Sequence, residues 1–460
     1  MAELGAEIVG RSERLRRGKA LREKCPRSSL GVWKAPGRDR DVIGLVKLSN
    51  RDRQQELVPV RHGRMLQSPF AFYRGTAFVQ AHDLAGSPTS GIEVQLCGDA
   101  HLMNFGGFAT PERNMIFGLN DFDETLPGPW EWDVKRLAAS FVVAARYRGF
   151  KRADARDVVL ECMRSYRRRL AEFSDLHALD VWYARITTED VRRATPANLR
   201  VNVDRIARRG RGRTSEAVFP KVTAIVDGKL RIRDDPPFVF HVETQFENFE
   251  RMASQVFARY RKTLQEDRRV ILDRFHVIDR AAKVVGVGSV GTRCYVILLM
   301  ADDDDPLFLQ MKEARPSVLE PYLGKARHRN DGERVVFGQR LIQAASDMFL
   351  GWTRGPAGRD FYFRQLRDMK VSVEIEEMPV ARLENYARLC GWALALAHAK
   401  SGDVSTHAGY LGASSAFDDA LADYAETYAD QVERDYAAFV KAVRAGKLKS
   451  DTGVDHVDGL

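Results

Sequence analysis

The sequence has few cysteines and no long apolar segment. Its five cysteines are scattered singly through 460 residues, without any Cys-x-x-Cys pair, which argues against a structural zinc site and for a reducing compartment. No apolar run approaches the roughly 20 residues of a membrane-spanning helix, and the charged N-terminus lacks the apolar core of a secretion signal. We therefore expect a cytoplasmic protein without a membrane partner.

Positive charge is concentrated at one end of the chain. Residues 1–64 contain 16 Lys and Arg but only 8 Asp and Glu, so they carry almost all of the net charge of +9. Such a segment could bind nucleic acid, but it has few aromatic side chains for base stacking. We therefore expect residues 1–65 to form a basic, partly extended strap that the apolar stretch 42–46 holds on the body.

A second basic tract lies at 205–213 and mixes arginine with glycine. Glycine commonly interrupts helices and strands, so this tract is predicted to be a loop before a hairpin at 222–232. Of the two basic tracts it is the better candidate for a nucleic-acid contact. The aromatic-rich segment 68–75 is expected to pack in the core, although its Arg74 could bind phosphate.

Polar residues near position 100 flank a predicted hairpin. Asp99 lies five positions before Asn104, and Asp121 follows Asn104 by seventeen positions. The stretch 105–119 between them reads as two short strands with a turn at 110–114. Because a hairpin brings its two ends together, we expect Asn104 and Asp121 to converge.

A glycine-rich segment lies between two predicted strands in the second half of the chain. The run 286–291 has the pattern GxGxxG, and β-branched and aromatic residues follow it at 292–299. Alone, this pattern is most typical of dinucleotide-binding turns that enter a helix. A following strand instead favours the loop that covers nucleotide phosphates in protein-kinase-like enzymes. The next predicted strand, 307–312, ends at Lys312, where such enzymes carry their phosphate-binding lysine.

Several motifs resemble segments of known enzymes. The segment 98–104, with the pattern Gly-Asp-x-His-x-x-Asn, resembles the catalytic loop of aminoglycoside and choline phosphotransferases. The segment 120–123, Asn-Asp-Phe-Asp, resembles their metal-binding acid segment, and Trp132-Asp133 resembles the structural acid that follows it. From 68 to 370 the chain resembles the uncharacterised bacterial family named domain of unknown function 2252.

The resemblance implies roles for the residues of the first half. Asp99 would orient and deprotonate the acceptor hydroxyl, with His101 beside it as a scaffold of the loop rather than a proton carrier. Asn104 and Asp121 would hold Mg²⁺ through oxygen atoms, the ligands this ion prefers. Asp133 would cap its helix or brace the catalytic loop.

The resemblance also implies an ATP site in the second half. Lys312 would neutralise phosphate charge beneath a flexible cover made by three glycines, Gly286, Gly288 and Gly291. The helix glutamate that normally pairs with such a lysine is not evident. Glu320 and Glu333 are candidates, whereas Glu313 should point to the opposite face of the strand. Because this glutamate is not evident, a second interpretation stays open: a kinase-like protein that binds nucleotide without transferring phosphate.

The order of these segments differs from that of ordinary kinases, in which the glycine loop and lysine precede the catalytic loop. A predicted helix at 383–400 would conventionally lead into that loop. The chain is therefore interpreted as α+β, a protein-kinase-like bilobal fold with a circularly permuted order of elements. We expect four regions: the basic segment 1–65, the first part of a helical catalytic lobe at 66–240, a strand-rich nucleotide-binding lobe at 241–375, and the remaining helices at 376–460.

The sequence favours an ATP- and Mg²⁺-dependent phosphotransferase that acts on a small hydroxylated or amino-containing acceptor. Two alternatives on the same fold are a nucleotide-binding pseudokinase and a nucleotidyltransferase. A third alternative is a nucleic-acid-binding protein that uses the basic N-terminal segment. No motif identifies the acceptor, and a fold by itself does not supply one.

Overall fold

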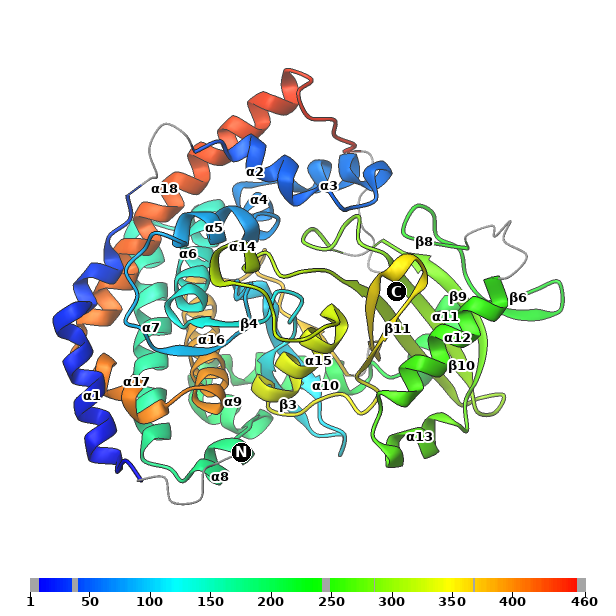
Figure 1. Cartoon of the computed structure of the whole chain (residues 1–460), viewed down its shortest axis with the longest axis horizontal. Coiled ribbons are helices and arrows are strands. Elements are labelled where there is room, and N and C mark those ends of the chain that lie inside the picture. Colours follow the sequence, from blue (N-terminus) through cyan, green and yellow to red (C-terminus); the bar gives the residue numbers. More distant parts are fainter. Residues whose placement is uncertain (1–7, 35–39, 242–248, 285, 367–368, 453–460) are drawn as a thin grey trace.

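A computed structural model of the chain describes residues 8–34, 40–241, 249–284, 286–366 and 369–452. Figure 1 shows a helical part on one side and a strand-rich part on the other, with the N-terminal helices along the outer edge and the top of the helical part. Helices and several antiparallel sheets occur together, which confirms the expected α+β class.

Long helices from separate stretches of the chain form the helical part. They are α6 (Glu131–Tyr147), α7 (Arg152–Ser174), α16 (Val380–Ser401), α17 (Val404–Leu411) and α18 (Ala416–Arg444). Helix α7 packs against α6, α16, α17 and α18. Their apolar side chains, among them Leu137, Phe141 and Leu394, are fully buried in one large core. Removal of this apolar surface from water is the main driving force that joins the segments.

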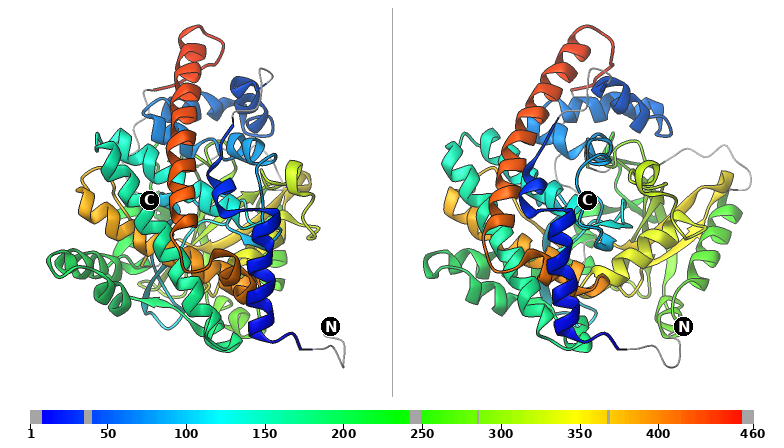
Figure 2. Two further views of the ribbon diagram at one scale, coloured as in Figure 1. Left: turned by 90° about the vertical axis from the view of Figure 1, so that its left-hand side faces the viewer. Right: turned by 60° about the vertical axis from the view of Figure 1, so that its left-hand side comes forward.

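The N-terminal segment consists mainly of short helices. They are α1 (Arg11–Lys24), α2 (Val42–Ser49), α3 (Val58–Met65), α4 (Pro69–Arg74) and α5 (Ala77–Leu84), with 3₁₀ turns at Arg27–Gly31 and Gln55–Leu57. Helix α1 packs on α17, and α2 contacts α18; Figure 2 shows α1 and α18 on the same side of the molecule. Val42 and Val46 are buried, so the apolar stretch holds the segment on the body as a helix.

A six-stranded antiparallel sheet dominates the strand-rich part. Its order is β12-β13-β11-β10-β9-β8, formed by β8 (Val239–Phe240), β9 (His276–Lys283), β10 (Cys294–Met300), β11 (Pro306–Ala314), β12 (Gly351–Arg354) and β13 (Asp360–Gln365). Val296 and Leu298 pack with α11 (Ser215–Val222) on one face, whereas Ile297 and Leu299 pack with α12 (Phe249–Lys262) on the other. Side chains alternate across a strand, so helices cover both faces.

The described residues also form smaller sheets. A four-stranded sheet has the order β14-β2-β3-β5, with β2 (Phe105–Ala109), β3 (Met115–Leu119), β5 (Ile186–Thr187) and β14 (Val371–Ser372). Two further pairs are β1 (Glu93–Leu96) with β4 (Leu126–Pro129), and β6 (Thr223–Val226) with β7 (Lys229–Ile232). The predicted hairpins 105–119 and 222–232 are therefore confirmed. Helix α15 (Asp331–Ile342) contacts β11, β12 and β13 of the large sheet and also β1.

The basic tract at 205–213 is largely helical, and the prediction of a loop there is wrong. Helix α10 spans Arg200–Arg211. Arginine is a good helix former, and Gly210 is the point at which α10 approaches its neighbours: a Cβ there would lie 2.6 Å from Cγ2 of Val371. The remaining helices are α8 (Ala178–Tyr183), α9 (Thr188–Ala194), α13 (Glu266–Leu272) and α14 (Glu320–Leu323), with 3₁₀ turns at Leu102–Asn104, Ala197–Leu199 and Pro356–Gly358.

Candidate active site

The loop after strand β1 is held in place by Asp133 on α6. The Asp133 carboxylate accepts hydrogen bonds from the backbone N–H groups of Cys97 at 2.7 Å and Gly98 at 3.0 Å. Gly98 has a φ of +88°, and a Cβ there would lie 2.2 Å from the Glu124 carbonyl oxygen, so the position requires glycine. Asp133 also contacts His398 Nε2 at 3.3 Å. Of its two predicted roles, Asp133 braces the loop.

Asp99 is oriented by a buried arginine. Its Oδ1 lies 2.8 Å from Nε of Arg136, whose side chain is only 4 % exposed. The same guanidinium donates to Oε1 of Gln80 at 2.9 Å and to the Tyr73 carbonyl oxygen at 2.9 Å. The Asp99 backbone carbonyl accepts a hydrogen bond from Nδ2 of Asn104 at 2.6 Å. Asp99 therefore has a fixed position at the wall of a cavity.

His101 is a neutral scaffold residue of this loop. Its Nδ1 accepts a hydrogen bond from the Met103 backbone N–H at 3.2 Å and so caps the following 3₁₀ turn. The His101 Nε2 lies 3.9 Å from Oδ2 of Asp99. Burial lowers the pKa of His101 to about 3, against the opposing effect of the Asp99 charge. A ring with this pKa carries no proton charge near neutral pH.

The hairpin of β2 and β3 brings Asn104 and Asp121 to its open end. Phe105 pairs with Leu119 at the end of the ladder, and the Asn120 backbone N–H donates to the Asn104 carbonyl oxygen at 2.9 Å. Strand pairing thereby brings together Asn104 and Asp121, which lie seventeen positions apart in sequence. The expected convergence of the two segments is confirmed.

Asp121 lies in a strongly positive environment. Burial by itself would raise the pKa of Asp121, but the charges of Lys312, Arg364 and Lys370 hold that pKa below its ordinary value. Burial lowers the pKa of Lys370 to about 7, with a further decrease from Arg364. Asp121 is therefore ionised and able to act as an acceptor or ligand.

Lys312 on β11 is paired with Asp123. The ammonium forms an ion pair with Oδ2 of Asp123, and the Tyr362 hydroxyl donates to Oδ1 of the same carboxylate at 2.7 Å. Lys312 is 3 % exposed. Burial would lower its pKa, but the charges of Asp121 and Asp123 raise the pKa above the ordinary lysine value. The lysine is thus a fully charged group that faces both carboxylates.

The expected glutamate candidates make other contacts. Glu313 receives hydrogen bonds from Arg293 and Arg359 on the opposite face of β11, as its sequence position predicts. Glu320 lies 3.4 Å from the Ser317 N–H, and Glu333 lies 3.8 Å from His328. Neither pairs with the lysine.

Helix α15 instead supplies a buried arginine to the acid segment. The Arg334 guanidinium donates to the carbonyl oxygens of Asp123 at 2.9 Å, Thr125 at 2.8 Å and Arg315 at 2.7 Å. Arg334 is 1 % exposed. It therefore connects the strand-rich part to the backbone of the acid segment, and no motif in the sequence indicated this role.

The glycine-rich segment forms the loop between β9 and β10. The Ser289 hydroxyl lies 3.4 Å from Oδ2 of Asp123, so the loop reaches the lysine–carboxylate pair. Residues of the N-terminal segment hold the far end of the loop. Nη1 of Arg53 donates to the Val290 carbonyl oxygen at 2.6 Å, and the Gln54 N–H donates to the Gly291 carbonyl oxygen at 2.8 Å.

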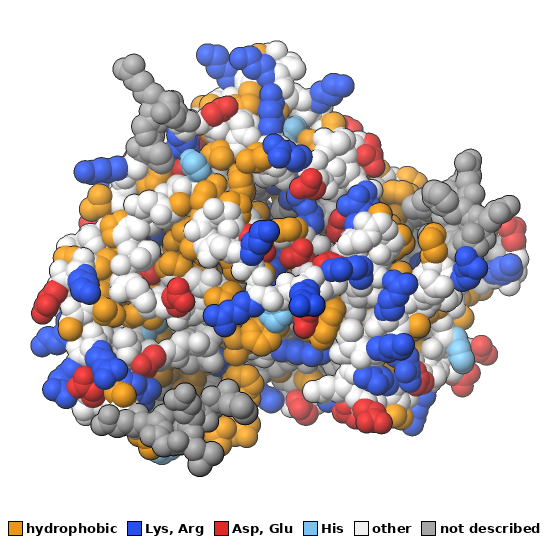
Figure 3. Space-filling view, viewed as in Figure 1, with side chains coloured by type: hydrophobic (Ala, Val, Ile, Leu, Met, Phe, Trp, Pro, Cys, Tyr) orange, Lys and Arg blue, Asp and Glu red, His pale blue; other side chains and the backbone are white. Residues whose placement is uncertain are grey.

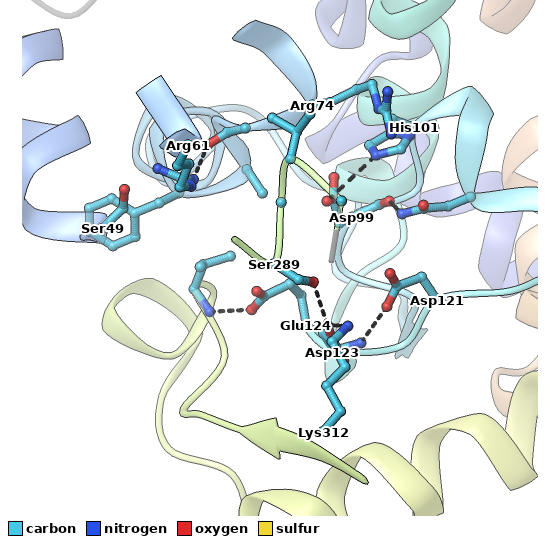
Figure 4. A pocket seen from close by; sticks show the side chains of 18 of the residues that line it. Ser49, Arg61, Arg74, Asp99, His101, Asp121, Asp123, Glu124, Ser289 and Lys312 are labelled. Atoms are coloured by element: carbon cyan, nitrogen blue, oxygen red, sulfur yellow. Dashed lines mark hydrogen bonds and ion pairs between the residues drawn. The ribbon is translucent and has the colours of Figure 1, made fainter. Parts of the chain in front are cut away.

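A single cavity of 180 Å³ joins these groups. Of the eight residues predicted for the site, all except Gly291 line it: Asp99, His101, Asn104, Asp121, Gly286, Gly288 and Lys312. Figure 4 shows Asp99, Asp121 and Asp123 on the same side of Ser289, with Lys312 beneath them. Adjoining cavities of 420 and 830 Å³ share parts of its wall. In Figure 3, acidic and basic side chains gather around a hollow between the two parts.

Basic side chains outside the eight predicted site residues also line this cavity. Arg53 and Arg61 come from the N-terminal segment, and Arg364 comes from β13. Arg74, which ends α4, lines the cavity as well, while Phe70 and Phe72 of the same helix are buried. The signal in the sequence was the excess of arginine at the N-terminus, but a charge excess does not tell which side chains turn inwards.

The oxygen atoms at this site suit Mg²⁺ that is bound together with phosphate better than they suit a metal ion bound by protein groups alone. Among the described residues, no group of three or more His, Cys, Asp or Glu side chains is arranged to hold a metal. Asn104 uses its Nδ2 as a donor, which leaves its Oδ1 as a ligand, and Asp121 supplies a carboxylate. Mg²⁺ is usually held by one or two such groups together with substrate phosphates and water. The residues therefore fit this ion only in company with a phosphate-bearing ligand.

Comparison with known proteins identifies a family. The family described as "Uncharacterized protein conserved in bacteria (DUF2252)" matches residues 53–442. No curated protein and no solved structure matches the chain. The matched region begins at Arg53 and contains every residue that lines the 180 Å³ cavity except Ser49. Within the described part of the chain, none of the helices combines the length and apolar character of a membrane span.

Proposed function

We propose that this chain, which belongs to the bacterial DUF2252 family, is an ATP- and Mg²⁺-dependent phosphotransferase with a permuted protein-kinase-like fold. The observation that carries the proposal is the meeting of Asp99, Asn104 and Asp121 with Lys312 in one cavity. These residues come from two stretches almost 200 positions apart. Together they supply a base, oxygen ligands for a divalent ion, and a cation for phosphate, which are the parts that phosphoryl transfer uses.

The order of elements around the large sheet supports a kinase-like nucleotide lobe. Strand β9, the glycine loop, β10, the lysine strand β11, helix α15 and strands β12 and β13 follow one another in the chain. In protein kinases a glycine loop likewise precedes a strand lysine, and a helix after that strand faces the site. Here the helix contributes Arg334 in place of a glutamate, and Asp123 takes the position of the lysine's acidic partner.

The contact between α16 and β1 supports the circular permutation. The Gln95 backbone N–H donates to the Ser401 hydroxyl at 3.1 Å, and a Cβ on Gly402 would lie 2.8 Å from Cγ1 of Val94. The end of α16 thus lies beside the strand that enters the catalytic loop. In a conventional order these two elements would be consecutive, so their contact is what a chain cut between them would show.

The proposed reaction is transfer of the γ-phosphoryl group from ATP to a hydroxyl group of a small molecule. The acceptor oxygen forms a bond to the γ-phosphorus as the bond to the β,γ-bridging oxygen breaks, and ADP leaves. Asp99, which Arg136 orients, accepts the proton from the acceptor hydroxyl. Asn104 and Asp121 would hold Mg²⁺, which neutralises phosphate charge when bound. Lys312 and the glycine loop position the phosphates.

Labelled ATP tests the proposal and separates its alternatives. Wild type is incubated with a metabolite extract and either γ-labelled or α-labelled ATP, and Asp99→Asn is compared with Asp304→Asn, an exposed control. We expect γ-label in a small product, a loss of about 10²–10⁴-fold in Asp99→Asn, and no loss in the control. Transfer of α-label would instead indicate a nucleotidyltransferase, and nucleotide binding without transfer of either label would indicate a pseudokinase.

A further inference from the structure

Arginines from the N-terminal helices face the cavity on the side away from Lys312. Arg53 follows α2, Arg61 lies on α3, and Arg74 ends α4. All three line the 180 Å³ cavity. Figure 4 shows Arg61 and Arg74 on one side of Ser289 and Lys312 on the other, with Arg74 nearest the catalytic loop.

Arg61 and Arg74 are only partly satisfied as hydrogen-bond donors. Arg61 is 2 % exposed; it donates to Oδ1 of Asn50 at 2.7 Å and to the Gly75 carbonyl oxygen at 2.6 Å. Its Nε and the Nε of Arg74 are buried without a hydrogen-bond partner among the described residues. A buried donor without a partner is costly, and more so when it is charged. Because both side chains line the cavity, a ligand bound there could accept hydrogen bonds from them.

The charge of these arginines is also poorly compensated by protein groups. Burial lowers the pKa of Arg61 to about 10, and the nearby Arg315 lowers it further against the opposing effect of Glu124. Burial likewise lowers the pKa of Arg74, although Asp99 and Glu376 act in the opposite direction. An anion between the two guanidinium groups would restore their charged hydrogen bonds.

The nucleotide phosphates have their own cations on the other side of the cavity. Lys312 and Arg364 lie next to Asp121, where the magnesium-bound phosphates are proposed to bind. Arg74 is instead close enough to Asp99 for that carboxylate to affect its pKa. These arginines and Asp99 line the same 180 Å³ cavity. The adjoining 830 Å³ cavity, whose wall includes Arg74, provides room for a small molecule.

We propose, on the basis of the phosphotransferase function above, that Arg61 and Arg74 bind an anionic group of the acceptor. The acceptor class is then a small molecule that carries a hydroxyl group together with a phosphate or a carboxylate. A planar guanidinium binds either oxyanion through two parallel hydrogen bonds. The N-terminal segment thus contributes substrate selectivity to a site whose catalytic residues lie elsewhere in the chain.

Titration of an oxyanion into the nucleotide-loaded protein tests this site. The full chain is saturated with Mg²⁺ and the non-hydrolysable analogue AMP-PNP, which fills the γ-phosphate position, and inorganic phosphate is then titrated by calorimetry. We expect binding by wild type and by the exposed control Arg51→Gln, with at least about tenfold weaker binding, equal to about 1.4 kcal/mol, in Arg74→Gln. A parallel titration with malonate distinguishes a carboxylate-bearing acceptor from a phosphate-bearing one.

Arg61→Gln provides a second variant, and retained AMP-PNP binding shows that each variant is folded. The proposal is overturned if the loaded wild type binds neither anion, if Arg74→Gln and the control bind alike, or if phosphate displaces AMP-PNP, since the arginines would then serve the nucleotide. If AMP-PNP itself does not bind, the phosphotransferase function fails. Titration of the unloaded protein would then still test the arginine site.

Discussion

Lys312 forms an ion pair with Asp123, which lies 189 positions earlier in the chain. The pair joins the strand-rich part to the acid segment, and the Tyr362 hydroxyl and Ser289 hydroxyl contact the same carboxylate. A glycine-loop residue, a sheet lysine and the acid segment 120–123 thereby meet at one side chain. The proposed nucleotide site depends on this meeting.

Lys312→Met should weaken binding of ATP analogues. Loss of the ammonium removes a charge-assisted contact to phosphate, worth about 1.5–3 kcal/mol, so the dissociation constant should rise about 10- to 100-fold. The measurement is calorimetric titration with AMP-PNP and Mg²⁺. Lys229→Met, at an exposed position of β7, is the matched control, and equal affinities in the two variants would contradict the assigned role.

Gly98→Ala should destabilise the protein more than an ordinary left-handed glycine does. Gly149 has a φ of +73° with no atom within 4 Å of a built Cβ, whereas a Cβ on Gly98 meets the Glu124 carbonyl at 2.2 Å. Gly149→Ala should cost about 1–2 kcal/mol of unfolding free energy for backbone conformation alone. Gly98→Ala should cost about 3 kcal/mol or more, because the backbone must also move. Urea denaturation of both variants measures the difference, and equal losses would refute the close-approach argument.

Glu124 should make stability fall as pH rises towards neutrality. Burial raises the pKa of Glu124 from 4.5 to about 7, with an opposing effect from the Val318 N–H. The folded state therefore binds a proton that the unfolded state has lost between these two pH values. The resulting contribution is complete below about pH 4.5 and is lost as pH rises through about 7, a change of about 3 kcal/mol.

Glu124→Gln keeps the shape of the side chain without the titration. Urea denaturation from pH 5 to 8.5 should show that wild type loses stability relative to this variant as pH increases. Glu93→Gln, at an exposed strand position, should track wild type throughout. A constant difference between wild type and Glu124→Gln would show that Glu124 is not buried as a neutral acid.

Local patterns predicted those parts of the site that depend on neighbours in sequence. The 105–119 hairpin follows from alternating apolar strands and a polar turn, and its pairing fixes the ends that hold Asn104 and Asp121. The strand within 292–299, which pairs with the strand that carries Lys312, followed from its β-branched and aromatic residues. In each case the sequence signal lies within about 20 residues of the group that it positions.

Contacts between distant segments were beyond the reach of these patterns. Asp123 is a polar residue in a turn, and only the packing of α15 and β11 around it makes it the partner of Lys312. Arg61 belongs to a run that reads as solvent-exposed charge, because a long polar side chain on a short helix gives no indication of which way it faces. The loop predicted in place of α10 was wrong for a related reason. A glycine in sequence favours a loop, but Gly210 lies in a helix that packs too closely against Val371 to admit a side chain.

Titration of AMP-PNP with and without Mg²⁺ tests the proposed joint site for metal and phosphate. In that site, Asp121 and Asn104 hold Mg²⁺ only together with phosphates that Lys312 also contacts. Wild type should bind AMP-PNP at least about tenfold more tightly with Mg²⁺ than without it, a gain of about 1.4 kcal/mol, and Asp121→Asn should lose that gain. No binding by wild type, or an equal Mg²⁺ effect in Asp121→Asn, would contradict the proposed site.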